Sequence, residues 1–181
     1  MDEFLNNIVD IDIDGLGLSF VQTGELVSKI RKVAPDLVLV AKVENSEGLR
    51  NCAEIVAHSD AIMIDRGDLS AEIGENYLYE AILKISNLTK MYGKPLIMAT
   101  DNLETMSKSN NPSKNDIISL GFSNQINSDV IMLSEETASS NKWKNIITWL
   151  SKFLIIKKYN LDHKLDDNIF WKTIDLIKDS T

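Results

Sequence analysis

Residues 38–49 (VLVAKVENSEGL) and 61–74 (AIMIDRGDLSAEIG) decide the fold that the sequence predicts. Each stretch begins with an apolar run of strand length and ends in charged residues. This pattern is typical of buried parallel strands that carry polar groups at their carboxyl ends. Because neighbouring parallel strands end at the same edge of a sheet, the charged residues of both stretches are predicted to lie together.

The residues at these two strand ends are of kinds that bind a metal ion and an anion. Lys42 and Glu44 lie two residues apart, so an extended chain directs both side chains the same way. Asp68 follows the second strand, and Gly67 beside it lets the backbone approach a ligand, ahead of a helix predicted from Leu69. Carboxylate oxygens suit Mg²⁺ or Mn²⁺. Lys42 would neutralise charge on a transferred phosphoryl group or an enolate.

A simpler interpretation of the same residues is also open. Lys42 and Glu44 would form a surface ion pair, and Asp68 would cap a helix. Strand ends collect charge for solubility as well as for chemistry. Spacing alone favours neither interpretation.

The rest of the chain alternates predicted strands and helices. The predicted strands are residues 16–21, 37–42, 61–64, 95–99 and 129–133, and the predicted helices are residues 24–33, 48–58, 77–91, 115–127 and 141–157. Such alternation predicts an α/β fold with parallel strands and right-handed crossovers. A complete eight-unit barrel needs about 250 residues. We therefore expect a partial TIM-type (β/α) barrel of about five units over residues 1–158, then a linker and an amphipathic helix over residues 159–181.

An incomplete barrel would leave two sheet edges unpaired, which favours association with another chain. We therefore expect a homo-oligomer or a complementing chain that supplies the missing strands. The composition, with 44% hydrophobic and 25% charged residues, is typical of a globular domain. The net charge of −8 argues against nucleic acid or an anionic membrane as a partner. One cysteine and an acidic start without a signal-like segment lead us to expect a cytoplasmic protein.

Five motifs in register resemble one enzyme family over roughly residues 10–149. They are LSFV (residues 18–21), AKVENSEG (41–48), RGDL (66–69), ATDNLETM (99–106) and VIMLSEETA (130–138). Their order and spacing are similar to those in the carboxyl-terminal part of the pyruvate kinase catalytic barrel. The resemblance implies glycolytic phosphoryl transfer from phosphoenolpyruvate to ADP, which gives pyruvate and ATP.

The resemblance also implies roles for individual residues. Lys42 would be catalytic and stabilise the phosphoryl group in flight, while Glu44 and Asp68 would bind Mg²⁺ or Mn²⁺. The family also uses K⁺. The K⁺ ligands, the phosphate-binding arginine and part of the nucleotide site belong to the family's first three barrel strands, which have no counterpart here. The family's lid domain and regulatory domain also have no counterpart here.

The same comparison implies a substrate site beside the metal. The backbone of Arg66, Gly67 and Asp68 would hold the substrate carboxylate. The hydroxyl of Thr100 would contact the substrate and take part in catalysis, and Ser19 would lie close by.

Some positions depart from the family pattern. The family has alanine where Asp65 stands, glutamine and methionine where Asp101 and Asn102 stand, glycine where Ser70 stands and arginine where Gln22 stands. Asp65 and Asp101 add negative charge near the expected carboxylate site. They would weaken phosphoenolpyruvate binding, serve as further metal ligands, or face away.

Three functions therefore stay open. The first is pyruvate kinase activity, incomplete in this chain alone. The second is a metal-dependent aldolase or lyase that acts through a pyruvate enolate, and the third is a non-catalytic or partner-dependent subunit. The enolate chemistry would need no ADP, and the non-catalytic subunit would tolerate loss of Glu44 and Asp68.

Overall fold

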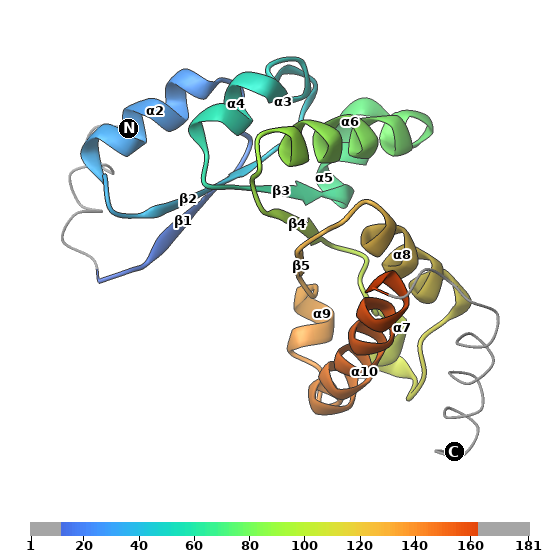
Figure 1. Ribbon diagram of the computed structural model, residues 1–181. Helices are drawn as coiled ribbons and strands as arrows, with labels where there is room; N and C mark the ends of the chain where they lie inside the picture. Colours follow the sequence, from blue (N-terminus) through green and yellow to red (C-terminus); the bar gives the residue numbers. More distant parts are fainter. Residues whose placement is uncertain (1–11, 163–181) are drawn as a thin grey trace. The chain divides into compact units, whose positions relative to one another are not determined.

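Five parallel strands form one sheet in a computed structural model that describes residues 12–162, with side chains through residue 155 (Figure 1). The strands are β1 (Gly15–Leu18), β2 (Val38–Lys42), β3 (Ala61–Asp65), β4 (Leu96–Ala99) and β5 (Val130–Ile131). They lie in the sheet in their order along the chain, with β1 and β5 at its two ends. The predicted α/β fold with five parallel strand-helix units is confirmed.

The chain divides into two compact units. The first unit, formed by residues up to 102 and residues 114–134, contains the sheet. Its helices are α2 (Gly24–Val33), α3 (Ser46–Arg50), α4 (Cys52–His58), α5 (Arg66–Ile73), the 3₁₀ turn η1 (Glu75–Tyr77), α6 (Leu78–Met91) and α8 (Lys114–Gln125). Every residue of the candidate site belongs to this unit.

The second unit contains residues 103–113 and the chain from residue 135 onward. Its helices are α7 (Thr105–Lys108), α9 (Glu135–Ala138) and α10 (Trp143–Asp162). Ile146 of α10 is buried, and Trp149 stacks on Phe153 with ring centroids 5.3 Å apart. Within the described part of the chain, no helix is long and apolar enough to cross a membrane. Helix α10 runs beyond the predicted end at residue 157, and most of the predicted terminal segment 159–181 lies outside the described residues.

The helix predicted over residues 48–58 is wrong, because two helices occupy this part of the chain. Helix α3 begins two residues earlier than predicted, where the Asn45 side chain caps it by accepting from the Gly48 N–H at 2.8 Å. Asn51 then separates α3 from α4, and its side chain donates to the carbonyl of Gln22 at 2.8 Å. The backbone of Asn51 departs from helical geometry, with φ −91° and ψ 13°.

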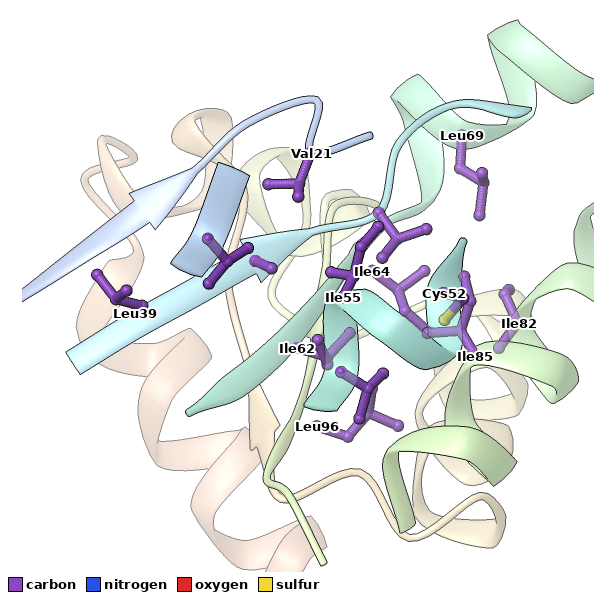
Figure 2. Packing of buried hydrophobic residues seen from close by; sticks show 14 of the residues in the cluster. Val21, Leu39, Cys52, Ile55, Ile62, Ile64, Leu69, Ile82, Ile85 and Leu96 are labelled. Carbon is purple, nitrogen blue, oxygen red and sulfur yellow. The ribbon is translucent and has the colours of Figure 1, made fainter. Parts of the chain in front are cut away.

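Alternation along the strands directs one set of apolar side chains toward the helices. Leu39 and Ala41 of β2 and Ile62 and Ile64 of β3 are buried, as are Val27, Cys52, Ile55 and Ile85 from the helices around them (Figure 2). Full burial of one such aliphatic side chain contributes about 1.5–3 kcal/mol. The single cysteine, Cys52, is buried in this core, and burial raises the pKa of its thiol to about 11. On the other side of β2, Val38 remains 48% exposed.

The sheet contains a repeated tie between neighbouring strands that the sequence shows as SDAIMI (residues 59–64) and SDVIML (residues 128–133). In the first copy, Asp60 precedes β3 and its carboxylate accepts from the Leu39 N–H of β2 at 2.7 Å. Arg31 of α2 also donates to this carboxylate. Asp60 thus joins β3 to β2 and to α2, the helix that precedes β2.

The second copy repeats this arrangement between β4 and β5. Asp129 accepts from the Leu96 N–H at 2.8 Å and pairs with Lys90 of α6 at 2.7 Å. Burial alone would raise the pKa of Asp129. The hydrogen bonds from Lys90 and from the Leu96 N–H, together with the charge of Lys90, lower this pKa below its ordinary value. The pKa of Asp60 is lowered for corresponding reasons.

We expect Asp129→Asn to lower the free energy of unfolding by about 0.5–1 kcal/mol at neutral pH. The asparagine oxygen can still accept from the Leu96 N–H, but the charge is lost, and partial exposure screens the ion pair. Because the folded-state pKa is lowered, this stabilisation is present above the unfolded-state pKa near about 3.9 and is lost as the pH falls through the folded-state pKa.

Urea denaturation at neutral and acidic pH, with exposed Asp36→Asn as the control, would check this prediction. The difference between wild type and Asp129→Asn should shrink in acid. An unchanged difference would contradict the assigned role of the charge.

Candidate active site

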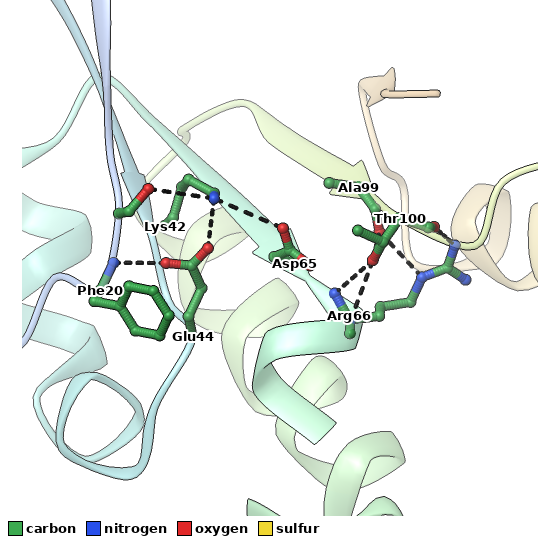
Figure 3. A network of polar contacts seen from close by, with 9 residues as sticks. Phe20, Lys42, Glu44, Asp65, Arg66, Ala99 and Thr100 are labelled. Atoms are coloured by element: carbon green, nitrogen blue, oxygen red, sulfur yellow. Dashed lines mark hydrogen bonds and ion pairs between the residues drawn. The ribbon is translucent and has the colours of Figure 1, made fainter. Parts of the chain in front are cut away.

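The carboxyl ends of β2 and β3 bring together a lysine and several acidic side chains (Figure 3). Lys42 is the last residue of β2, and its Nζ lies 2.5 Å from Glu44 Oε1 and 3.6 Å from Asp65 Oδ2. The same ammonium donates to Ser19 Oγ at 3.4 Å. The structure thus places Ser19, Lys42 and Glu44 in one group.

Glu44 is fully buried, which excludes the simple surface ion pair considered from the sequence. Its Oε2 accepts from the Phe20 N–H at 2.5 Å, while Oε1 lies 2.5 Å from the Lys42 Nζ as an ion pair. Phe20 adopts φ 52°, an uncommon conformation for a residue other than glycine. The turn after β1 therefore aims a backbone donor at the carboxylate.

Lys42 is held in its charged form. Burial alone would lower the pKa of the ammonium, but the hydrogen bond and charge of Glu44, with the charges of Asp65 and Asp68, raise it above its ordinary value. The side chain is therefore a cation at neutral pH. Such a group can stabilise a developing negative charge and is poorly suited to accept a proton.

Three carboxylates of this group could hold a metal ion. One oxygen each from Glu44, Asp65 and Asp68 lies within 4.8 Å of the others. Hard oxygen donors of this kind suit Mg²⁺ or Mn²⁺, and the buried Glu44 Oε1, which pairs with the Lys42 ammonium at 2.5 Å, already faces a cation. Asp101 is exposed and is not a member of this group.

Asp68 lies inside the first turn of α5 and not at its cap position. The helix begins at Arg66, earlier than the predicted start at Leu69, and Asp65 occupies the cap position without a side-chain capping hydrogen bond. The carboxylates of Asp65 and Asp68 are therefore not used to cap this helix. A Cβ on Gly67 would make an ordinary contact of 3.7 Å with Asp65 Oδ1, so this glycine lies directly beside the carboxylate group.

The first N–H groups of α5 converge on the hydroxyl of Thr100, which follows β4. Thr100 Oγ1 accepts from the Arg66 N–H at 3.0 Å and from the Gly67 N–H at 3.2 Å. It donates to the carbonyl of Ala99 at 2.7 Å. Two backbone donors at a helix start form a suitable site for a carboxylate, and Thr100 lies beside it.

Thr100 has φ 59°, an unfavourable conformation for a β-branched residue that costs on the order of 1–3 kcal/mol. Arg66 holds this conformation through its buried guanidinium, which donates to the carbonyls of Ala99 and Thr100 and to Asn102 Oδ1. The Arg66 side chain also donates to Ser119 Oγ at 2.5 Å. These bonds use the side chain to fix the loop, while the backbone N–H of Arg66 faces the site.

Asn102 contributes to the site indirectly, and sequence reasoning noted it only as a departure from the family. Its side-chain amide donates to the carbonyls of Met98 at 3.1 Å and Met132 at 2.8 Å, and so joins the ends of β4 and β5. The available signal was an amide side chain three residues after the predicted strand 95–99, where backbone carbonyls at the end of a strand need donors.

The fold and site define the class of protein: a parallel α/β domain of barrel type, with an acidic, lysine-containing group at the carboxyl edge of its strands. The sequence model of the family described as "Pyruvate kinase, barrel domain" matches residues 2–145. The chain belongs to the pyruvate kinase family.

Curated proteins of similar sequence are also named pyruvate kinases. The chain is 33% identical over 166 residues to a pyruvate kinase, cytosolic isozyme, of Nicotiana tabacum. The aligned region covers 90% of this chain and 33% of that protein. It is 35% identical over 134 residues to a pyruvate kinase of Hypocrea jecorina. This aligned region covers 72% of the chain and 25% of the relative. The chain thus spans about a third or less of the length of these relatives.

We expect Thr100→Val to lower the free energy of unfolding by about 1–2 kcal/mol, since two N–H groups lose their acceptor. Thr100→Ser keeps the hydroxyl and should cost less than about 0.5 kcal/mol. Urea denaturation of both variants measures this difference. A loss in Thr100→Ser together with little loss in Thr100→Val would show that the methyl group, and not the hydroxyl, stabilises the loop.

Proposed function

We propose that this chain supplies the metal and phosphoenolpyruvate site of a pyruvate kinase-type phosphotransferase. The observation that carries the proposal is the convergence of the Lys42 ammonium with the carboxylates of Glu44 and Asp68 in a member of this family. The proposed reaction is the glycolytic transfer of a phosphoryl group between phosphoenolpyruvate and ADP.

Each residue has a role that its geometry supports. Glu44 and Asp68 would hold Mg²⁺ or Mn²⁺, which supplies Lewis acidity toward oxygens of the substrate. Lys42, kept cationic by its neighbours, would stabilise charge on the phosphoryl group during transfer. Electrostatic stabilisation by positioned groups is the main contribution that a protein makes to this class of reaction.

The substrate carboxylate would bind at the start of α5. The N–H groups of Arg66 and Gly67 point to one position, now taken by Thr100 Oγ1. A carboxylate that accepts from both donors would take the place of Thr100 Oγ1, and the displaced Thr100 hydroxyl would donate to it, with Asp68 and Ser19 also contributing to the substrate site. Thr100 would thus orient the substrate for reaction at the ammonium.

We further propose that activity requires strands beyond those described here. The sheet ends at β1 and β5, and the chain spans a third or less of its relatives' length. A second copy or a complementing chain would supply the remaining strands, the nucleotide contacts and any K⁺ ligands. A cytoplasmic location fits the name of the Nicotiana tabacum relative, a cytosolic isozyme.

One observation favours the alternatives of enolate chemistry or a non-catalytic subunit. Asp65 pairs with Lys42 at 3.6 Å and so offsets part of the positive charge that a phosphoryl group would meet. A metal-dependent pyruvate enolate needs less positive charge than a phosphoryl group does. A non-catalytic subunit needs none.

The proposal predicts saturable Mn²⁺ binding by the purified chain that strengthens with phosphoenolpyruvate. Electron paramagnetic resonance measures free Mn²⁺ during the titration. The Glu44→Gln/Asp68→Asn double variant should lose binding, because two oxygen ligands lose their charge. The matched control is Glu25→Gln/Asp36→Asn, which removes two exposed carboxylates outside the site and should bind as wild type does.

Turnover of phosphoenolpyruvate with ADP, assayed on the same preparations, separates the remaining functions. Metal binding with turnover supports the phosphotransferase. Metal-dependent exchange of pyruvate protons without ADP would support enolate chemistry. Absence of Mn²⁺ binding in a folded wild-type chain would refute the proposed site and favour the non-catalytic subunit.

A further inference from the structure

Asp65 has a position in the site that neither of its neighbouring elements requires for folding. It ends β3 and occupies the cap position of α5, yet its side chain makes no capping hydrogen bond. The residue is only 8% exposed. Its carboxylate instead faces the Lys42 ammonium at 3.6 Å and lies within 4.8 Å of carboxylate oxygens of Glu44 and Asp68.

The charges of this group do not balance without a cation. One ammonium, from Lys42, faces the carboxylates of Glu44, Asp65 and Asp68, so the four side chains carry a net charge of −2. Glu44 and Asp65 are buried and Asp68 is exposed, and the Lys42 ammonium pairs with Glu44 Oε1 at 2.5 Å. One ammonium does not compensate all three carboxylates, and a divalent cation would bring the group to neutrality.

We propose that Asp65 is a specificity-determining residue, which strengthens binding of the divalent cation and lowers the affinity of the site for highly charged anions. The inference rests on the proposed metal and substrate site. It concerns the net charge of the ligands that this site favours. With Asp65 ionised and a divalent cation bound, the group is neutral. Without the Asp65 charge, the same group would carry +1.

Within the proposed site, the Asp65 charge therefore favours a carboxylate of low charge, such as the pyruvate monoanion, relative to phosphoenolpyruvate. Phosphoenolpyruvate, a trianion at mildly alkaline pH, has two more negative charges that Asp65 repels. At about 6 Å in a high dielectric, two extra charges change the affinity by about tenfold. The ratio of affinities for these two ligands is therefore a measure of the Asp65 charge.

The experiment compares wild type with Asp65→Asn, which removes the charge and keeps the side-chain shape. Mn²⁺ binding is measured by electron paramagnetic resonance. Pyruvate and phosphoenolpyruvate binding are then measured by calorimetry at saturating Mn²⁺ and mildly alkaline pH. We expect Mn²⁺ affinity to fall by about tenfold, because one charged ligand is lost. We expect the ratio of phosphoenolpyruvate to pyruvate affinity to rise by about tenfold.

The use of a ratio keeps the test valid if the variant is less stable, because a general disturbance of the site weakens both ligands together. Asp36→Asn, an exposed residue at the other end of β2, removes the same charge and should leave both quantities unchanged. A pair of salt concentrations provides a second check, since the change in the ratio should decrease as salt screens the charge.

The outcomes also separate this inference from the proposed function. If wild type binds Mn²⁺ and Glu44→Gln abolishes binding, the proposed metal site stands. An Asp65→Asn variant that then matches wild type in Mn²⁺ affinity and in the ligand ratio would overturn the role of Asp65 alone. If wild type binds no Mn²⁺, the proposed metal site fails and the inference falls with it.

Discussion

The buried carboxylate of Glu44 is the constraint on which the arrangement at the carboxyl edge of the sheet depends. A charge without solvent contact is costly unless other groups compensate it. The Phe20 N–H from the turn after β1 and the Lys42 ammonium from the end of β2 supply part of this compensation. The positions of two loops and one strand end are therefore linked through a single side chain.

The other side of the site is fixed in a different way. Here Arg66 and Asn102 use neutral carbonyl acceptors to hold the loop after β4, including the strained Thr100. Backbone strain of this kind persists only where surrounding bonds determine the conformation. The chain therefore combines an electrostatic group on β2 and β3 with a rigid, hydrogen-bonded loop on β4, and the start of α5 lies between them.

Much of this arrangement could be predicted from the sequence, because it follows from periodicity. The apolar runs gave the five strands, and the two-residue spacing of Lys42 and Glu44 gave their common direction. The direction of Asp65 could not be predicted, since a residue at a strand end can face either a ligand or solvent. The positive φ of Thr100 was also hidden, because β-branched residues ordinarily avoid that conformation. The break at Asn51 depended on a tertiary contact with Gln22.

The strand order has a further consequence, for the way in which the chain acquires its structure. Every strand pairs with the strand next to it in sequence, and Asp60 and Asp129 join β3 to β2 and β5 to β4. Each new strand therefore needs only the strand before it as a pairing partner. Such a sheet can grow one strand-helix unit at a time, in step with synthesis of the chain from its amino terminus.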